Sequence, residues 1–174
     1  MKRLGARLAC LSLSVALYAQ GQCAGKIETP QSDRTILYRL HKHAQFVIAA
    51  SLLAEERCQT PDVKEFGERL EKDYKVADLK VRALAGRLGV KFKDNKIGQP
   101  PDPRLTLLES APIAEFDQRF VRAIARRHAA IIPAMEHQIG LLPKEGLIYD
   151  LLDQVLPVMR EHYQTATTLG HAPK

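Results

Sequence analysis

Three histidines, a tyrosine and an aspartate fall where a helical bundle would bring their side chains to one level: His43, Tyr74, His128, His162 and, at the edge, Asp73. Imidazole and carboxylate groups in the core of a bundle are suitable ligands for a transition metal. The same side chains can instead be core residues that hydrogen-bond to one another. The residue types therefore leave two interpretations open, a metal site and a structural polar cluster.

The level of these residues follows from four helices, which we predict from apolar residues recurring at helical spacing. The apolar stripes cover residues 36–54, 63–88, 113–135 and 148–169. Thr60-Pro61-Asp62 is typical of a capped helix start, so the first predicted helix spans about 33–58 and the second follows after a short turn. No segment alternates as a strand would.

Loop length predicts how the helices are connected. Short links make the first and second helices, and the third and fourth, antiparallel hairpins. About 24 residues separate the second helix from the third, with a Gly- and Pro-rich loop at 86–103 and a short helical turn at 104–110. A link this long can run the length of the bundle. We therefore expect an all-α, ferritin-like four-helix bundle with a long crossover, rather than an up-down-up-down bundle.

The spacing of two further pairs of residues shows whether each pair could share a site. Asp117 and His128 are eleven residues apart, so they lie about 16 Å apart along one helix and cannot bind the same ion. We expect Asp117 to be structural, as a carboxylate near a helix N-terminus. His41 lies two positions before His43, so the two diverge, and His41 is expected to face solvent.

The di-iron pattern of ferritin-like proteins is not present. That pattern needs Glu-x-x-His on two helices and further Glu on the other two. Every histidine in this chain has a non-acidic residue three positions before it. We therefore expect no ferroxidase, and the sequence offers no Gly-rich phosphate loop and no catalytic residues that we can assign. A transition metal ion is the one cofactor that the histidines leave open.

Residues 1–21 have the layout of a signal peptide. A basic MKRLGAR precedes the apolar LACLSLSVALYA and small residues, which place a cleavage site near Gly21. The apolar run is too short to span a bilayer. A retained N-terminal anchor, or a lipoprotein attached through Cys23, remains an alternative. We expect a periplasmic or secreted protein with a flexible tail at 22–32 and a bundle domain at 33–170.

Charge and composition restrict the partners. Cleavage would remove three of the 26 basic side chains and no acid, which lowers the net charge from +6 to +3. The chain has no Trp and 6% aromatic residues, so we expect no nucleic-acid partner. A basic strip on the third helix is either a solvated face or a contact for an anionic membrane or an envelope protein; it comprises Arg119, Arg122, Arg126 and Arg127.

The mature chain would keep two cysteines, Cys23 and Cys58. A bond between them would need ten residues, reaching roughly 33–36 Å, to run back along a helix about 38 Å long. We expect the thiols to be free or to pair between molecules, and their fate stays open.

Four stretches carry a resemblance to a known family: PDVKEFGERLEKDY, EFDQRFVRAIARRH, LPVMREH and residues 52–57. Over about residues 33–169 the chain resembles domain-of-unknown-function family 4142, secreted bacterial proteins with a ferritin-like bundle. The resemblance implies an exported protein without a settled activity. Family members usually carry His and Glu where this chain has Tyr74 and Val47. If the family's polar cluster binds a metal, this chain retains His128 and His162, and His43 could compensate.

These features predict a non-catalytic envelope or stress-related interaction module. The alternative is a metal-binding protein with a histidine site in its core, formed by His128 and His162 with support from His43, Tyr74 or Asp73.

Overall fold

The computed structural model describes residues 30–92 and 102–171, which form helices and, within these ranges, no strand. Four helices are long and one is short: α1 (Gln31–Arg57), α2 (Pro61–Arg87), α3 (Pro103–Glu109), α4 (Ile113–Leu141) and α5 (Leu147–His171). The all-α class is thereby confirmed. The predicted signal peptide, its cleavage site and Cys23 lie outside the described residues.

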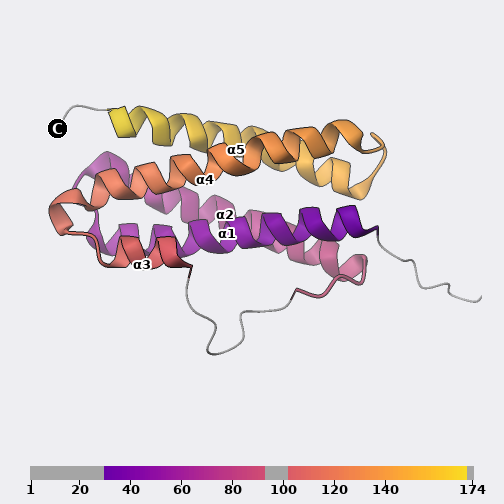
Figure 1. Ribbon diagram of the computed structural model, residues 1–174, viewed down its shortest axis with the longest axis horizontal. Helices are drawn as coiled ribbons and strands as arrows, with labels where there is room; N and C mark the ends of the chain where they lie inside the picture. Colours follow the sequence, from indigo (N-terminus) through magenta and orange to yellow (C-terminus); the bar gives the residue numbers. More distant parts are fainter. Residues whose placement is uncertain (1–29, 93–101, 172–174) are drawn as a thin grey trace, which may run out of the picture.

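The long helices form two hairpins that lie against each other (Figure 1). One hairpin is α1 with α2, and the other is α4 with α5. Along the chain, α2 and α4 run in the same direction in Figure 1, as the long connection between them predicted. That connection contains α3, which packs against α1 and α4 and corresponds to the short helix expected at 104–110. α1 begins two residues earlier than predicted, directly after Pro30.

Local chemistry explains where α2 begins and ends. Pro61 occupies the first helical position, where its missing N–H costs nothing. Thr60 contributes no side-chain cap, contrary to the prediction. At the other end Gly89 has a φ of 66° and belongs to a Schellman motif, in which the Val90 N–H donates to Ala85 O (2.8 Å) and the Gly89 N–H donates to Gly86 O (3.2 Å). Glycine adopts this left-handed conformation without the steric cost that a Cβ would bring.

The hydrophobic core consists of two apolar clusters, one toward each end of the bundle. The first comprises mainly residues 44–74 of α1 and α2, 116–124 of α4 and Ala166 of α5. The second comprises mainly residues 36–40 of α1, 81–85 of α2, 132–135 of α4 and 148–159 of α5. On α1, α4 and α5 the boundary between the clusters falls at a histidine. The apolar core is therefore interrupted by one polar layer at mid-height.

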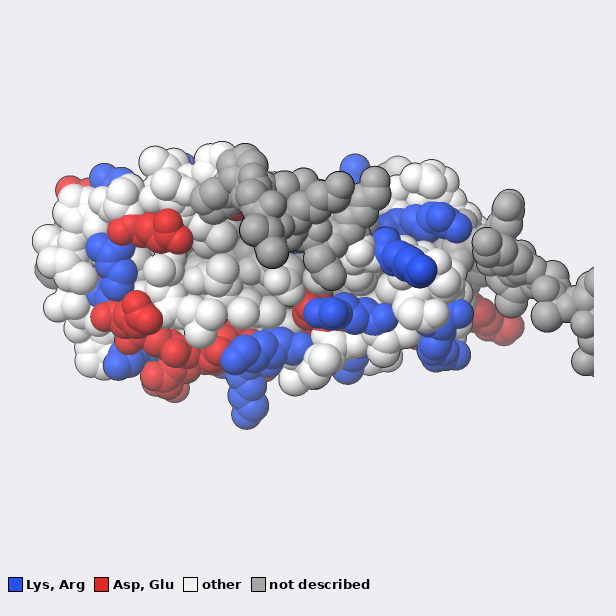
Figure 2. Space-filling model, turned by 90° about the horizontal axis from the view of Figure 1, so that it is seen from below, with Lys and Arg blue, Asp and Glu red and all other residues white. Residues whose placement is uncertain are grey.

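The surface carries both signs of charge. On the face shown in Figure 2, Lys and Arg side chains spread along the length of the molecule, while Asp and Glu gather mainly toward the end at the left. None of the helices in the described part of the chain is both long and apolar enough to cross a membrane. Cys58 is a half-buried free thiol, and burial, with the charge of Asp117, raises its pKa to about 12.

Candidate binding groove and buried histidine layer

The polar layer brings together one side chain from each long helix. His43 of α1, Tyr74 of α2, His128 of α4 and His162 of α5 are each no more than 4% exposed. The ring centroids of His43 and His128 are 4.8 Å apart, and those of His128 and His162 are 6.1 Å apart. The convergence inferred from helical period and loop length is therefore present in the structure.

The Tyr74 hydroxyl lies between two of these histidines. Its oxygen is 2.6 Å from Nε2 of His128 and 3.0 Å from Nε2 of His43. Nδ1 of His128 lies 2.8 Å from the carbonyl oxygen of Ile124, one helical turn earlier. A carbonyl oxygen can only accept, so His128 carries its proton on Nδ1.

The carbonyl of Ile124 fixes the direction of the hydrogen bonds that link His43, Tyr74 and His128. Neutral His128 has a bare Nε2, which accepts the proton of the Tyr74 hydroxyl. The Tyr74 oxygen must then accept from His43, whose proton is on Nε2. Nδ1 of His43 consequently has a free lone pair. The hydrogen bonds run from His43 through Tyr74 and His128 to the carbonyl of Ile124.

Burial keeps these groups neutral. It lowers the pKa of His43 well below its ordinary value, and the nearby His128, Arg127 and His162 lower it further. Burial also lowers the pKa of His128 to about 4, although the hydrogen bond to Ile124 acts in the opposite direction. The pKa of the Tyr74 hydroxyl is raised, mainly by burial. Near neutral pH the three hydrogen-bonded side chains are therefore uncharged. The direction of their hydrogen bonds requires this neutral state.

His162 is bonded separately. Its Nε2 lies 3.0 Å from Oδ2 of Asp73, which is at the edge of the layer with 37% of its side chain exposed. Burial lowers the pKa of His162, while the hydrogen bond and the charge of Asp73 act the other way. The Asp73 carboxylate accepts the Nε2 proton, so neutral His162 has a bare Nδ1. Nδ1 of His162 and Nδ1 of His43 are both buried and have no protein partner.

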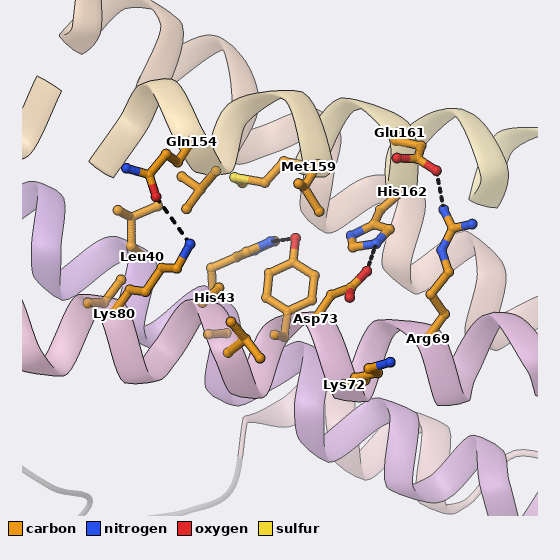
Figure 3. Close-up of a pocket in the computed structure, with 17 residues that line it drawn as sticks. Leu40, His43, Arg69, Lys72, Asp73, Lys80, Gln154, Met159, Glu161 and His162 are labelled. Atoms are coloured by element: carbon orange, nitrogen blue, oxygen red, sulfur yellow. Dashed lines mark hydrogen bonds and ion pairs between the residues drawn. The ribbon is translucent and has the colours of Figure 1, made fainter. Parts of the chain in front are cut away.

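Both of these histidines line a groove between α2 and α5 (Figure 3). The groove has a volume of about 510 Å³, and α2 and α5 pack less closely against each other than the two helices of either hairpin. Its walls are mostly apolar; they are formed by Leu40, Ala44, Val76, Ala77, Val81, Val155, Val158 and Met159. Polar groups from α2 and α5 lie along the groove at its two ends. The Lys80 ammonium donates to Gln154 (3.1 Å), and Arg69 pairs with Glu161 (2.8 Å).

The metal interpretation meets a geometric constraint here. Nε2 of His43 and His128 both point at the Tyr74 hydroxyl, and Nε2 of His162 points at Asp73. Within residues 30–92 and 102–171, no three His, Cys, Asp or Glu side chains are arranged to hold one metal ion. The nitrogens left for a metal are the Nδ1 atoms of His43 and His162, so His128 offers none.

The solvent-facing prediction for His41 is wrong. This side chain is 5% exposed, its Nδ1 lies 2.6 Å from Oδ1 of Asp78, and its ring stacks on Phe92 at 4.3 Å. His41 and His43 do diverge, but α2 and the segment that follows it cover His41 as well. Asp78 also accepts from Gln45 (3.0 Å). The sequence signal for this pair was the placement of Asp78 four residues after Tyr74, on the same face of α2.

Asp117 is structural, but by a different contact from the one expected. Its two carboxylate oxygens accept from the backbone N–H groups of Gln59 (3.0 Å) and Thr60 (2.8 Å), so it ties α4 to the start of α2. Burial raises the pKa of Asp117, but these hydrogen bonds outweigh it and hold the pKa below its ordinary value. Asp117 thus supplies the acceptor at the start of α2 that the Thr60 side chain does not.

The predicted arginine strip is not uniform. Arg122 and Arg126 are exposed, and Arg119 pairs with Glu115 at 2.7 Å. Arg127 instead turns inward, where it donates to the Lys42 carbonyl (3.2 Å) and lies over the ring of Phe46. The strip therefore contains three solvent-facing arginines rather than four.

The fold and the site define a helical-bundle protein with a polar layer in its core and a groove along one side. The sequence matches the domain-of-unknown-function family DUF4142 over residues 19–169, and the chain belongs to that family. A crystal structure of a DUF305 fragment from Deinococcus radiodurans is similar, with a TM-score of 0.70 at 15% identity over 82% of this chain and 98% of that one. At this identity the likeness concerns the fold. No curated protein matches the sequence.

Proposed function

We propose that this protein is an exported, ferritin-like helical bundle that acts as a non-catalytic binding module, with the α2–α5 groove as its binding site. The observation that carries the proposal is that two residues lining the groove, His43 and His162, each have a buried imidazole nitrogen without a partner. A buried polar atom without a hydrogen bond is costly, by about 1–3 kcal/mol. A ligand that entered the groove could supply the missing partners.

The state of the polar layer supports binding rather than catalysis. His43, Tyr74 and His128 direct their hydrogen bonds at one another and at a carbonyl. A general acid or base works best with a pKa near the operating pH. The pKa values of His43 and His128 are displaced downward and that of Tyr74 upward, away from neutrality. The layer is suited to holding a fixed pattern of donors and acceptors.

The export part of the proposal rests on residues 1–21 and on their basic, apolar and small segments. It is tested by fusing these residues to a reporter that is active only outside the cytoplasm, with Lys2, Arg3 and Arg7 replaced by acids in the control. We expect activity from the native leader alone. Equal activity from both fusions, or none from either, would contradict export.

Binding in the groove is tested with Nile red, a neutral apolar dye whose fluorescence rises in apolar surroundings. Val158 lines the groove and is 39% exposed, so Val158→Trp should fill it without disturbing the core. The matched control is Tyr163→Trp, because Tyr163 is similarly exposed on α5 and is not a lining residue. We expect saturable dye binding by the native protein and the control, and a large loss in Val158→Trp. Equal binding by both variants would place the dye elsewhere and would reject the groove.

A metal-binding protein is the second candidate, and the bare Nδ1 atoms of His43 and His162 are the observation that favours it. Imidazole nitrogens are good ligands for zinc, copper and nickel. The test is the metal content and melting temperature of protein purified without a His-tag, before and after addition of each ion. The control is the His43→Ala, His162→Ala double variant. Metal content and melting temperature that are the same in both proteins would reject a metal site.

A further inference from the structure

We propose that the α2–α5 groove takes a neutral, largely apolar molecule with a hydroxyl group, which donates its one proton to Nδ1 of either His43 or His162. This inference rests on the proposed binding function, because it names the class of ligand for the same groove. It follows from the direction of the hydrogen bonds, from the walls and from the charges at the edge.

The direction of the hydrogen bonds makes both nitrogens acceptors. The proton of His43 is committed to Tyr74 because Tyr74 must donate to His128, and that of His162 is committed to Asp73. Each ring therefore presents a lone pair on Nδ1, buried and without a partner. A ligand oxygen without a proton would place lone pair against lone pair. A ligand must bring a donor.

The charges at the edge argue against a cation as that donor. Lys72 and Lys80 both lie along the groove, and Arg69 is already paired with Glu161. The Asp73 carboxylate accepts from His162. A cationic ligand would be repelled by the lysines, and apolar walls would desolvate its charge without compensation. An uncharged hydroxyl meets neither cost.

The dimensions set the size of the ligand. Arg69 and Lys80, which lie at the two ends, are eleven residues apart on α2, or about 16 Å along the helix axis. Between them the lining is mostly aliphatic, and the volume of about 510 Å³ is within the range of small-molecule sites. A molecule of one to three fused rings, or a short branched chain, would be accommodated with its hydroxyl directed at His43 or His162.

The experiment compares 2-naphthol with 2-methoxynaphthalene, which has the same ring system but no donor. Binding to the native protein is measured by fluorescence and by side-chain ¹⁵N NMR of the histidines near neutral pH. We expect 2-naphthol to bind about five- to tenfold more tightly than the ether, as one extra hydrogen bond allows. We also expect the Nδ1 resonance of His43 or of His162, whichever accepts the hydroxyl proton, to shift on binding of 2-naphthol. In the His43→Phe, His162→Phe double variant, which removes both acceptors, the preference should fall toward equality.

The outcomes separate this inference from the proposed function. Equal affinity for the two compounds, both lost in Val158→Trp, would overturn the hydroxyl preference and leave the groove as a binding site. Tighter binding of the anion 2-naphthoate would also overturn the preference. Binding of Nile red but of neither naphthalene compound would overturn the inference as well. If the native protein bound none of the compounds, Nile red included, the result would count against the proposed function itself. Because the comparison uses the native protein, it holds even if the double variant does not fold.

Discussion

Acid should destabilise this protein through its buried histidines, and His128 gives the size of the effect. Its pKa is about 4 in the folded state, against an ordinary value of 6.5. Between these two values the unfolded chain binds a proton that the folded chain does not. Stability from this group is therefore complete above about pH 6.5 and is lost as the pH falls toward 4. The ring is 0% exposed, so solvent screening does not reduce the effect.

The magnitude follows from the difference of about 2.5 pKa units. One unit corresponds to about 1.4 kcal/mol, so His128 alone removes roughly 3 kcal/mol from the free energy of unfolding between pH 6.5 and 4. The pKa values of His43 and His162 are lowered too, so they act in the same direction. Domains are typically stable by about 5–15 kcal/mol. A loss of this size is a large part of that range.

The assay is urea unfolding followed by circular dichroism at about pH 7.5, 6.5, 5.5 and 4.5. We expect the free energy of unfolding to be nearly constant between the first two and to fall by about 1.4 kcal/mol per unit for each histidine that titrates below them. His128→Gln should reduce the slope. His137→Gln, which alters an exposed histidine on the same helix, should leave it unchanged. A native slope near zero between pH 6.5 and 4.5 would refute the reasoning, as would equal slopes in the two variants.

Three further predictions concern stability at neutral pH. Tyr74→Phe removes the hydroxyl that bonds two buried histidines, and it should cost about 2–4 kcal/mol in urea unfolding; a cost below 1 kcal/mol would show that the histidines repack or hydrate. Asp117→Ala should lower the free energy of unfolding by about 1–2 kcal/mol. The difference from the native protein should shrink in strong acid. The pKa of this carboxyl is lowered in the folded state, so its contribution is lost once it is protonated. Arg57 donates to the carbonyls of Leu108, Glu109 and Ala111, so Arg57→Ala should speed amide exchange in α3 well before α1 or α4; unchanged exchange would mean that packing alone holds α3.

The sequence by itself was enough for the helices and for the level at which four polar residues meet. A period of 3.6 residues marks each apolar stripe, and proline and glycine mark the ends of α2. Once helix lengths and the long connection are known, a rise of 1.5 Å per residue places His43, Tyr74, His128 and His162 at one height. The helical period and the rise per residue are local quantities, so an error of one or two residues at a helix end changes the predicted heights little.

Only the tertiary structure decided which hydrogen bonds those residues make and which of them line the groove. Which nitrogen is bare depends on the Ile124 carbonyl and the Tyr74 oxygen for His128 and His43, and on the Asp73 carboxylate for His162. The burial of His41 and the contact of Asp117 with the start of α2 depend on segments that are distant in sequence and fold over them. The groove lies between α2 and α5, which pack less closely against each other than the two helices of either hairpin. Helical periodicity gives the face of one helix, whereas the spacing between two helices is set by every side chain packed between them.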